Sequence, residues 1–120
     1  MVGVVRPVVM LFNGVEMKDI TTAIKERLRY YDGMGYSPYS INCGICDEFA
    51  QDLQSIFPSG EAIWGEDSPE LFVTDDVPMG HCFFKYKEKY YDSESIYGEN
   101  IPDNLNYYKR ILKNNKCLTY

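Results

Sequence analysis

Apolar residues recur at helical spacing in two segments of the chain. In the first segment the apolar positions are Ile20, Ala23, Ile24 and Leu28. In the second they are Phe49, Ala50, Leu53, Ile56 and Phe57. Polar and charged residues fill the intervening positions, as they do on the solvent face of an amphipathic helix. We predict one helix from about residue 19 to residue 31, and a second that begins near Cys46 and stops before Pro58.

Short runs of β-branched and aromatic residues predict strands. Such runs occupy residues 8–12, 15–17, 62–64, 71–73, 81–86 and 89–93. Asn13 and Gly14 favour a tight turn between the first two, and Lys87 and Glu88 separate the last two, which predicts a hairpin. Residues 33–42, rich in Gly, Ser, Tyr and Pro, are expected to form a loop, and residues 104–112 a last helix. Helices and hairpins in this order indicate an α+β fold.

Length and composition describe one ordinary globular domain. The chain has 120 residues, of which 45% are hydrophobic and 25% charged, so residues 1–120 are expected to form a single domain around one core. Residues 2–12 are apolar, but Arg6 and Pro7 interrupt them and no basic start precedes them. This pattern is not typical of a signal peptide or a membrane span, and we expect a cytoplasmic protein without a membrane partner.

Charge and cysteine content narrow the function classes further. A net charge of -6 and a pI of about 4.7 argue against nucleic acid as a partner, because phosphate binding needs a basic face. The oligomeric state cannot be read from the sequence. Four cysteines without an export signal suggest a reducing compartment, in which thiols stay free unless they bind metal or do chemistry.

Cys46 and His81 are the candidate nucleophile and base. A thiolate is stabilised at the first turn of a helix by unpaired N–H groups and the positive end of the helix dipole, and Cys46 is predicted to lie there. Acyl transfer by a thiol also needs a general base beside the sulfur. His81 is the only histidine in the chain, so a histidine base must be this residue.

The predicted hairpin brings carboxylates close to His81. If the strands turn at Lys87 and Glu88, residues whose numbers add up to 175 lie opposite one another. Phe83 then faces Asp92, and His81 faces Glu94. Either carboxylate could hold the imidazole in the useful tautomer.

These residues carry a family resemblance. The segment Cys43-Gly44-Ile45-Cys46 resembles the nucleophile helix of papain-like enzymes, in which the second cysteine attacks. His81-Cys82-Phe83-Phe84 followed by Tyr90-Tyr91-Asp92 is similar to the histidine and aspartate strands of transglutaminase-like domains, and to small phage and bacterial proteins. The resemblance implies a nucleophile helix packed on a small antiparallel sheet, and the catalytic residues Cys46, His81 and Asp92.

The resemblance also implies a function. We expect a cysteine-dependent acyl-transfer hydrolase of the peptidase, amidase or deamidase type, without cofactor or metal. Its substrate would be a protein or peptide, and for a phage member a host protein. Ser40 stands where papain-like enzymes have an oxyanion-binding glutamine, and Asn42 could replace it.

Further residues around the site have weaker expected roles. Cys43 is expected to be a supporting thiol rather than the nucleophile. Tyr39 and Trp64 are candidate walls of a substrate groove. Asp47 stands where the papain-like pattern has tryptophan, and an acid at that position would disfavour the thiolate.

Three other functions remain open at this level. The Cys43-Gly44-Ile45-Cys46 segment also resembles a thioredoxin or glutaredoxin motif, with Cys43 as the attacking thiolate. Cys43, Cys46, His81 and Cys82 could bind zinc, although His81 and Cys82 should point to opposite faces of a strand. The last alternative is a catalytically silent phage accessory protein that acts by binding a host enzyme.

Overall fold

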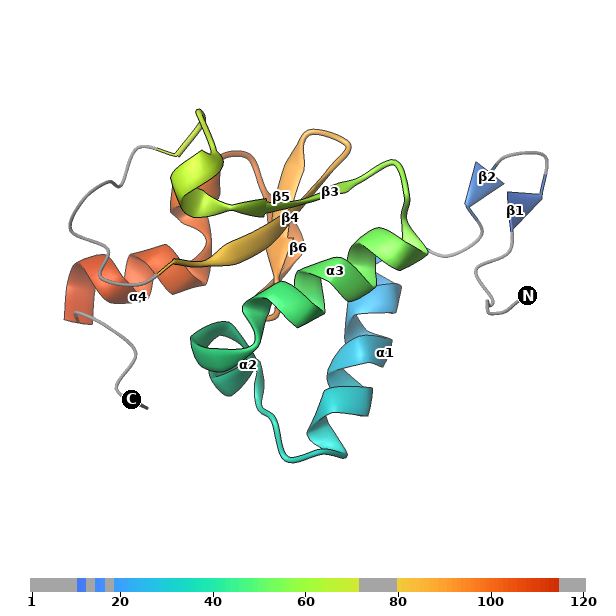
Figure 1. Cartoon of the computed structure of the whole chain (residues 1–120), viewed down its shortest axis with the longest axis horizontal. Coiled ribbons are helices and arrows are strands. Elements are labelled where there is room, and N and C mark those ends of the chain that lie inside the picture. Colours follow the sequence, from blue (N-terminus) through green and yellow to red (C-terminus); the bar gives the residue numbers. More distant parts are fainter. Residues whose placement is uncertain (1–10, 13–14, 17–18, 72–79, 115–120) are drawn as a thin grey trace.

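The fold is a small α+β arrangement built on a four-stranded antiparallel sheet (Figure 1). The computed structural model describes residues 11–12, 15–16, 19–71 and 80–114. The strand order in the sheet is β3-β4-β5-β6, so each strand pairs with its neighbour in sequence. The predicted α+β class is confirmed.

The two helices predicted from apolar spacing are both present. Helix α1 spans Ile20–Asp32, and the side chain of Asp19 caps it by accepting a hydrogen bond from the Thr22 backbone N–H. Helix α3 spans Cys46–Ile56 and has no side-chain cap. The N-terminus of α3 is thus left with backbone N–H groups that no capping side chain satisfies.

A short helix occupies part of the segment predicted as a loop. Helix α2 spans Pro38–Gly44. Ser37 caps it, Ser40 hydrogen-bonds back to the backbone of Ser37, and Pro38 takes the first helical position. The loop prediction was therefore wrong for this segment. A helix of seven residues is too short to show a clear apolar period, and its start is determined by its capping residues.

The central hairpin follows the predicted register. Strands β4 (Cys82–Tyr86) and β5 (Lys89–Asp92) pair with Phe84 opposite Tyr91. Lys87 and Glu88 both have positive φ, at 51° and 65°, as a two-residue turn of type I′ requires. The hairpin and its turn are confirmed.

The outer strands flank this hairpin. Strand β3 spans Glu61–Trp64, close to the predicted residues 62–64, and pairs with β4. Strand β6 spans Ser95–Glu99 and pairs with β5, and no run of strand-forming residues predicted it. Of the strand expected at residues 71–73, Leu71 lies outside any strand and the other two residues lie outside the described part of the chain.

The remaining elements are short. Strands β1 (Leu11–Phe12) and β2 (Val15–Glu16) form a separate two-stranded sheet. They agree with the predicted first hairpin, the rest of which lies outside the described residues. Short 3₁₀ turns η1 (Gly65–Asp67) and η2 (Pro102–Asn104) follow β3 and precede the last helix. Helix α4 spans Asn106–Asn114, which confirms the predicted last helix with shifted ends.

Two cores cover the two faces of the sheet, because side chains alternate between the faces along a strand. The core against α1 and α3 includes Ile24, Phe49, Leu53, Phe57, Phe84, Tyr86 and Tyr91. The core against α4 includes Phe83, Tyr90, Leu105, Tyr107, Tyr108 and Ile111. In the described part of the chain, the helices are all too short or too polar to cross a bilayer.

Candidate active site

Cys46 lies where helix α3 meets the beginning of strand β4. It is the first residue of α3, and its side chain packs with Ala50 and Cys82. The backbone N–H of Cys82 donates a hydrogen bond to the Cys46 Sγ, with 3.3 Å between nitrogen and sulfur. The residue is 8% exposed. A thiolate here would therefore be stabilised by a directed N–H group as well as by the helix terminus.

His81 immediately precedes β4 and is almost completely buried. Its Nε2 lies 2.9 Å from the Asp92 Oδ2, and both side chains are shielded from solvent. Its ring stacks on the ring of Tyr107, with 3.8 Å between centroids and 14° between planes. Tyr108 meets the imidazole edge-on. The imidazole is thus held in one orientation by a carboxylate and two aromatic rings.

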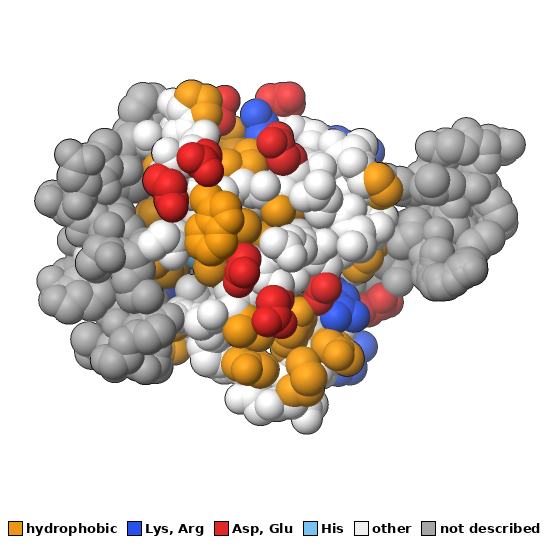
Figure 2. All heavy atoms as spheres, viewed as in Figure 1, with side chains coloured by type: hydrophobic (Ala, Val, Ile, Leu, Met, Phe, Trp, Pro, Cys, Tyr) orange, Lys and Arg blue, Asp and Glu red, His pale blue; other side chains and the backbone are white. Residues whose placement is uncertain are grey.

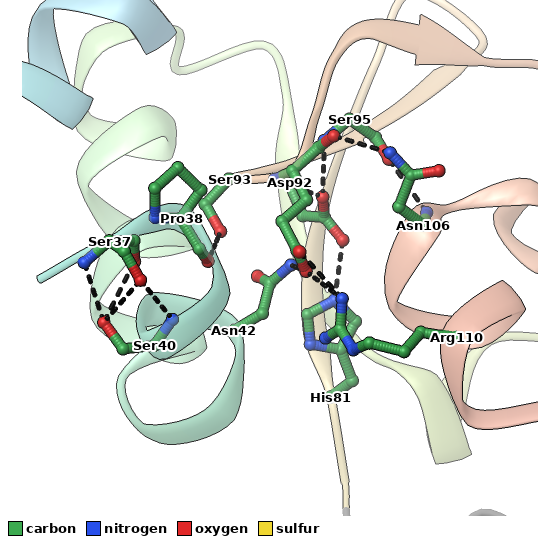
Figure 3. A network of polar contacts seen from close by, with 11 residues as sticks. Ser37, Pro38, Ser40, Asn42, His81, Asp92, Ser93, Ser95, Asn106 and Arg110 are labelled. Carbon is green, nitrogen blue, oxygen red and sulfur yellow. Dashed lines mark hydrogen bonds and ion pairs between the residues drawn. The ribbon is translucent and has the colours of Figure 1, made fainter. Parts of the chain in front are cut away.

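Asp92 is fixed by the bend that joins β5 to β6. Its Oδ1 accepts hydrogen bonds from the backbone N–H groups of Glu94 and Ser95, each at 2.9 Å. Its Oδ2 remains for His81, as Figure 3 shows. Because both oxygens have their own partners, the carboxylate cannot rotate without losing hydrogen bonds to the backbone.

The bend also attaches two helices to the site. The Ser93 hydroxyl donates to the Pro38 carbonyl at the start of α2. At the start of α4, the Asn106 backbone N–H donates to the Ser95 hydroxyl and the Asn106 side chain donates to the Glu94 carbonyl. Figure 3 shows these contacts on both sides of Asp92. The residue that orients His81 is therefore held by a network that joins β5, α2 and α4.

The hydrogen bond to Asp92 determines which nitrogen of His81 faces the thiol. An ionised carboxylate only accepts, so Nε2 carries the proton in the neutral imidazole and Nδ1 keeps its lone pair. Nδ1 is buried and has no hydrogen-bond partner. Burial lowers the pKa of His81, but the hydrogen bond to Asp92 and the interaction with the Cys46 thiol outweigh it, so the pKa is raised overall. His81 is thus suited to accept a proton from Cys46.

Cys82 is a poor nucleophile despite its nearness to Cys46. Burial, reinforced by the negative charges of Cys46, Asp47 and Glu66, raises the pKa of Cys82 to about 12. Cys82 lies on the α3 side of the sheet, away from the Tyr107 ring that stacks on His81. The site therefore holds one thiol placed for chemistry and one that stays protonated at neutral pH.

The structure does not bring Glu94 to His81. The Glu94 carboxylate accepts hydrogen bonds from the Arg110 Nη1 at 2.8 and 2.7 Å and from the Asn42 Nδ2 at 2.9 Å. The prediction that Glu94 lies opposite His81 was wrong, because β5 ends at Asp92 and the chain then bends into β6. Of the two carboxylates considered, only Asp92 contacts the imidazole.

Asn42 and Cys43 also differ from their expected roles. The Asn42 amide, expected to bind an oxyanion, donates to Glu94 instead, and its Oδ1 is buried without a partner. Cys43 is buried against the α4 core and is disulfide-bonded, whereas Cys46 and Cys82 are free. The expectation of free thiols is therefore wrong for Cys43, and its disulfide does not involve Cys46.

The two expected groove residues have different surroundings. The Tyr39 ring lies under the Arg110 guanidinium, with 4.6 Å from the Cζ to the ring centroid. Tyr39 thus packs against the arginine that pairs with Glu94. Trp64 ends β3 opposite Cys82 and is 38% exposed. Of the two, Trp64 is the better placed to meet a substrate beside the thiol.

Tyr107 and Arg110 are the site residues that sequence reasoning missed. Tyr107 stacks on His81, and the Arg110 guanidinium lies 5.8 Å from the Tyr107 ring centroid. Their three-residue separation on α4 puts them on one helix face. That spacing was the only available signal, and it does not reveal which partner the face meets.

Comparisons with known proteins give no relative for this chain. No family model, no curated protein and no solved structure matches it.

Within residues 11–12, 15–16, 19–71 and 80–114, no group of three or more His, Cys, Asp or Glu side chains could hold a metal ion.

Proposed function

We propose that the protein is a cysteine-dependent acyl-transfer enzyme in which Cys46 is the nucleophile, His81 the general base and Asp92 the residue that orients His81. The observation that carries the proposal is the buried imidazole, whose Nε2 is bonded to Asp92 while Nδ1 is left for the thiol. Acyl transfer needs a nucleophile, a base next to it and an acceptor that orients the base.

The first half of the proposed reaction forms an acyl-enzyme. His81 Nδ1 takes the proton of Cys46, and the thiolate attacks the carbonyl carbon of an amide, forming a C–S bond and an oxyanion. When the oxyanion collapses, the C–N bond breaks and His81 returns its proton to the leaving amine. Asp92 keeps Nε2 protonated throughout and stabilises the imidazolium that forms.

The second half releases the acyl group. Water, or a second amine in a transfer reaction, loses a proton to His81 and attacks the thioester carbon. The C–S bond then breaks, and the thiolate recovers the proton from His81. Hydrolysis, deamidation and transfer share the acyl-enzyme and differ only in the leaving group and the second nucleophile.

Backbone N–H groups are the proposed oxyanion donors. Helix α3 begins at Cys46 without a side-chain cap, so the Cys46 backbone N–H has no partner within the helix. A donor of this kind beside the attacked carbon stabilises the developing negative charge. The Asn42 amide is assigned no such role, since it donates to Glu94.

A papain-like or transglutaminase-like fold is part of the same proposal. The nucleophile begins a helix, and that helix packs against an antiparallel sheet which carries the histidine and then the aspartate. The chain order Cys, His, Asp supports this assignment. A host protein as substrate and a phage or bacterial origin also remain proposals, as does a cytoplasmic location.

A catalytically silent binding protein is the second candidate function. It is favoured by the burial of the site, because Cys46 is 8% exposed and His81 1% exposed. The redox alternative has less support. The Cys43 disulfide does not include Cys46, and helix α2, rather than a central strand, precedes the motif.

The test is the rate at which iodoacetamide alkylates Cys46, followed by intact mass and peptide mapping from pH 5 to pH 9. We expect rapid alkylation at Cys46 well below the pKa of an ordinary thiol, loss of the adduct in Cys46→Ser, and a slower rate in His81→Ala. Cys82→Ser is the matched control and should react like the wild type, because the raised pKa of Cys82 keeps that thiol silent. A Cys46 rate equal to that of an unstructured cysteine peptide would refute an enzyme and favour the silent binding protein.

A further inference from the structure

Acidic and basic residues are segregated along the chain. No Lys or Arg occurs between Arg29 and Lys85, whereas ten of the 18 Asp and Glu residues lie in that interval. They are Asp32, Asp47, Glu48, Asp52, Glu61, Glu66, Asp67, Glu70, Asp75 and Asp76. The interval includes α2, α3 and β3, the elements that surround Cys46. Figure 2 shows acidic side chains gathered around hydrophobic ones on the face that α3 and β3 share.

Two of these acids lie beside the candidate nucleophile. Asp47 follows Cys46 in α3, and Glu66 lies in η1, directly after β3. Both act electrostatically on the Cys82 thiol, whose own backbone N–H contacts the Cys46 Sγ. Among the ion pairs of the described residues, neither Asp47 nor Glu66 takes part. Their charges are therefore available to a ligand.

Trp64 and Glu66 lie together next to Gly80, just before His81 and strand β4. A Cβ atom added to Gly80 would lie 3.2 Å from the Glu66 Oε1 and 3.4 Å from the Trp64 ring. Gly80 immediately precedes His81, so the indole and the carboxylate border the approach to the site. An exposed indole beside a carboxylate suits a cation, which is attracted by the ring face and by the negative charge.

The rim residues lie close to the reacting centre. His81 Nδ1 is buried and has no partner other than the Cys46 thiol, with which His81 interacts. Asp47 directly follows Cys46, and Trp64 pairs with Cys82, whose backbone N–H contacts the Cys46 Sγ. A substrate that reaches Cys46 would therefore pass these rim residues.

We propose that Trp64, Glu66 and Asp47 select a positively charged side chain, lysine or arginine, next to the carbonyl group that Cys46 attacks in a peptide or protein substrate. The inference rests on the proposed function, whose substrate class it names. A cation at the rim would also offset the unfavourable effect of Asp47 on the neighbouring thiolate. An acidic group at the same substrate position would be repelled by both carboxylates.

Three peptidyl acyloxymethyl ketones test the proposal, identical except for lysine, norleucine or glutamate at the residue that bears the ketone. Cys46 displaces the carboxylate leaving group and forms a thioether, which intact mass detects. We expect the lysine probe to react fastest and the glutamate probe slowest. Each carboxylate should contribute about a two- to fivefold change in the lysine-to-glutamate rate ratio, as exposed charge pairs do.

Charge variants identify the source of the preference. Glu66→Gln and Asp47→Asn should each lower the lysine-to-glutamate ratio. Glu99→Gln, on the part of β6 that pairs with Tyr90 and away from Asp92, is the matched control and should leave the ratio unchanged. Raising the salt concentration from 10 mM to 500 mM should reduce the ratio in the wild type, because exposed charges are screened.

The outcomes separate this inference from the proposed function. If Cys46 reacts with all three probes at equal rates, or prefers glutamate, the cationic specificity is wrong while the nucleophile stands. A lysine preference that Glu66→Gln and Asp47→Asn leave intact would also overturn the inference. If no probe labels Cys46 in a folded protein, the proposed function fails and the inference fails with it.

Discussion

Replacing Asp92 with asparagine separates the orienting role of this residue from its place in the fold. The Asp92 Oδ1 accepts two backbone N–H groups, and the Oδ2 faces the His81 Nε2. In Asp92→Asn the oxygen must stay with the backbone donors, so the new NH₂ group points at His81. Two donors then face each other unless the imidazole moves its proton from Nε2 to Nδ1. In that tautomer the nitrogen beside Cys46 can no longer act as a base.

The size of the effect follows from the hydrogen bond that is lost. A hydrogen bond to a charged group contributes about 1.5 to 3 kcal/mol, which corresponds to roughly a 10- to 150-fold change in rate. The second-order rate constant for iodoacetamide at Cys46 should therefore fall by about this factor at pH 6 to 7. Intact mass over a time course measures it, and peptide mapping assigns the adduct to Cys46 rather than to Cys82, whose raised pKa keeps that thiol silent.

The control is Asp32→Asn, which makes the same chemical change at the exposed end of α1. It should alkylate like the wild type. Thermal unfolding followed by circular dichroism verifies that both variants are folded. If folded Asp92→Asn reacts within about twofold of the wild type across pH 5 to 9, Asp92 does not orient His81 and the triad interpretation is wrong.

Three further predictions concern stability. The raised pKa of His81 favours its charged form in the folded state. The contribution of His81 to the free energy of unfolding should therefore be fully present below pH 6.5 and be lost as the pH rises through the folded-state pKa. Urea unfolding should show a free energy of unfolding that declines above pH 6.5, and a flat profile would contradict this. Gly98→Ala should lower the free energy of unfolding by more than about 1 kcal/mol, because Gly98 has a φ of 90° and a Cβ would lie 2.9 Å from the Tyr91 ring; an unchanged urea midpoint would refute this. Tyr31→Phe should cost about 1 kcal/mol by removing the hydrogen bond to Asp52, and a thermal midpoint equal to that of the wild type would show that water replaces this bond.

The candidate triad could be predicted because it depends on local rules. The first residue of an amphipathic helix is visible in the spacing that begins near Cys46, and a two-residue turn fixes the register of its hairpin. The register relation that was inferred from the turn is the one that the structure has between Phe84 and Tyr91. The helix start and the turn therefore indicated Cys46, His81 and two candidate carboxylates, and the family resemblance favoured Asp92 over Glu94.

The surroundings of the candidate triad could not be predicted, because they depend on where strand β5 ends and the regular alternation of its side chains stops. Strand β6 begins three residues after β5 ends, and this bend turns Glu94 away from His81 and toward Arg110. A register rule carried past the end of a strand gives the wrong neighbour, since it assumes that the chain continues straight. Irregular bends are fixed by individual hydrogen bonds, such as that from Ser93 to Pro38, and such pairings have no period in the sequence.

The same contrast explains why charge was informative only after the fold was known. The interval between Arg29 and Lys85 without basic residues is visible in the sequence, but a run of acids usually forms a solvated face. Its meaning changes once β3 brings Trp64 opposite Cys82 and η1 brings Glu66 over Gly80. Asp47 and Glu66 then lie near the candidate nucleophile Cys46. A negative surface at that position favours a cationic substrate, whereas the same composition on a distant face would favour only solubility.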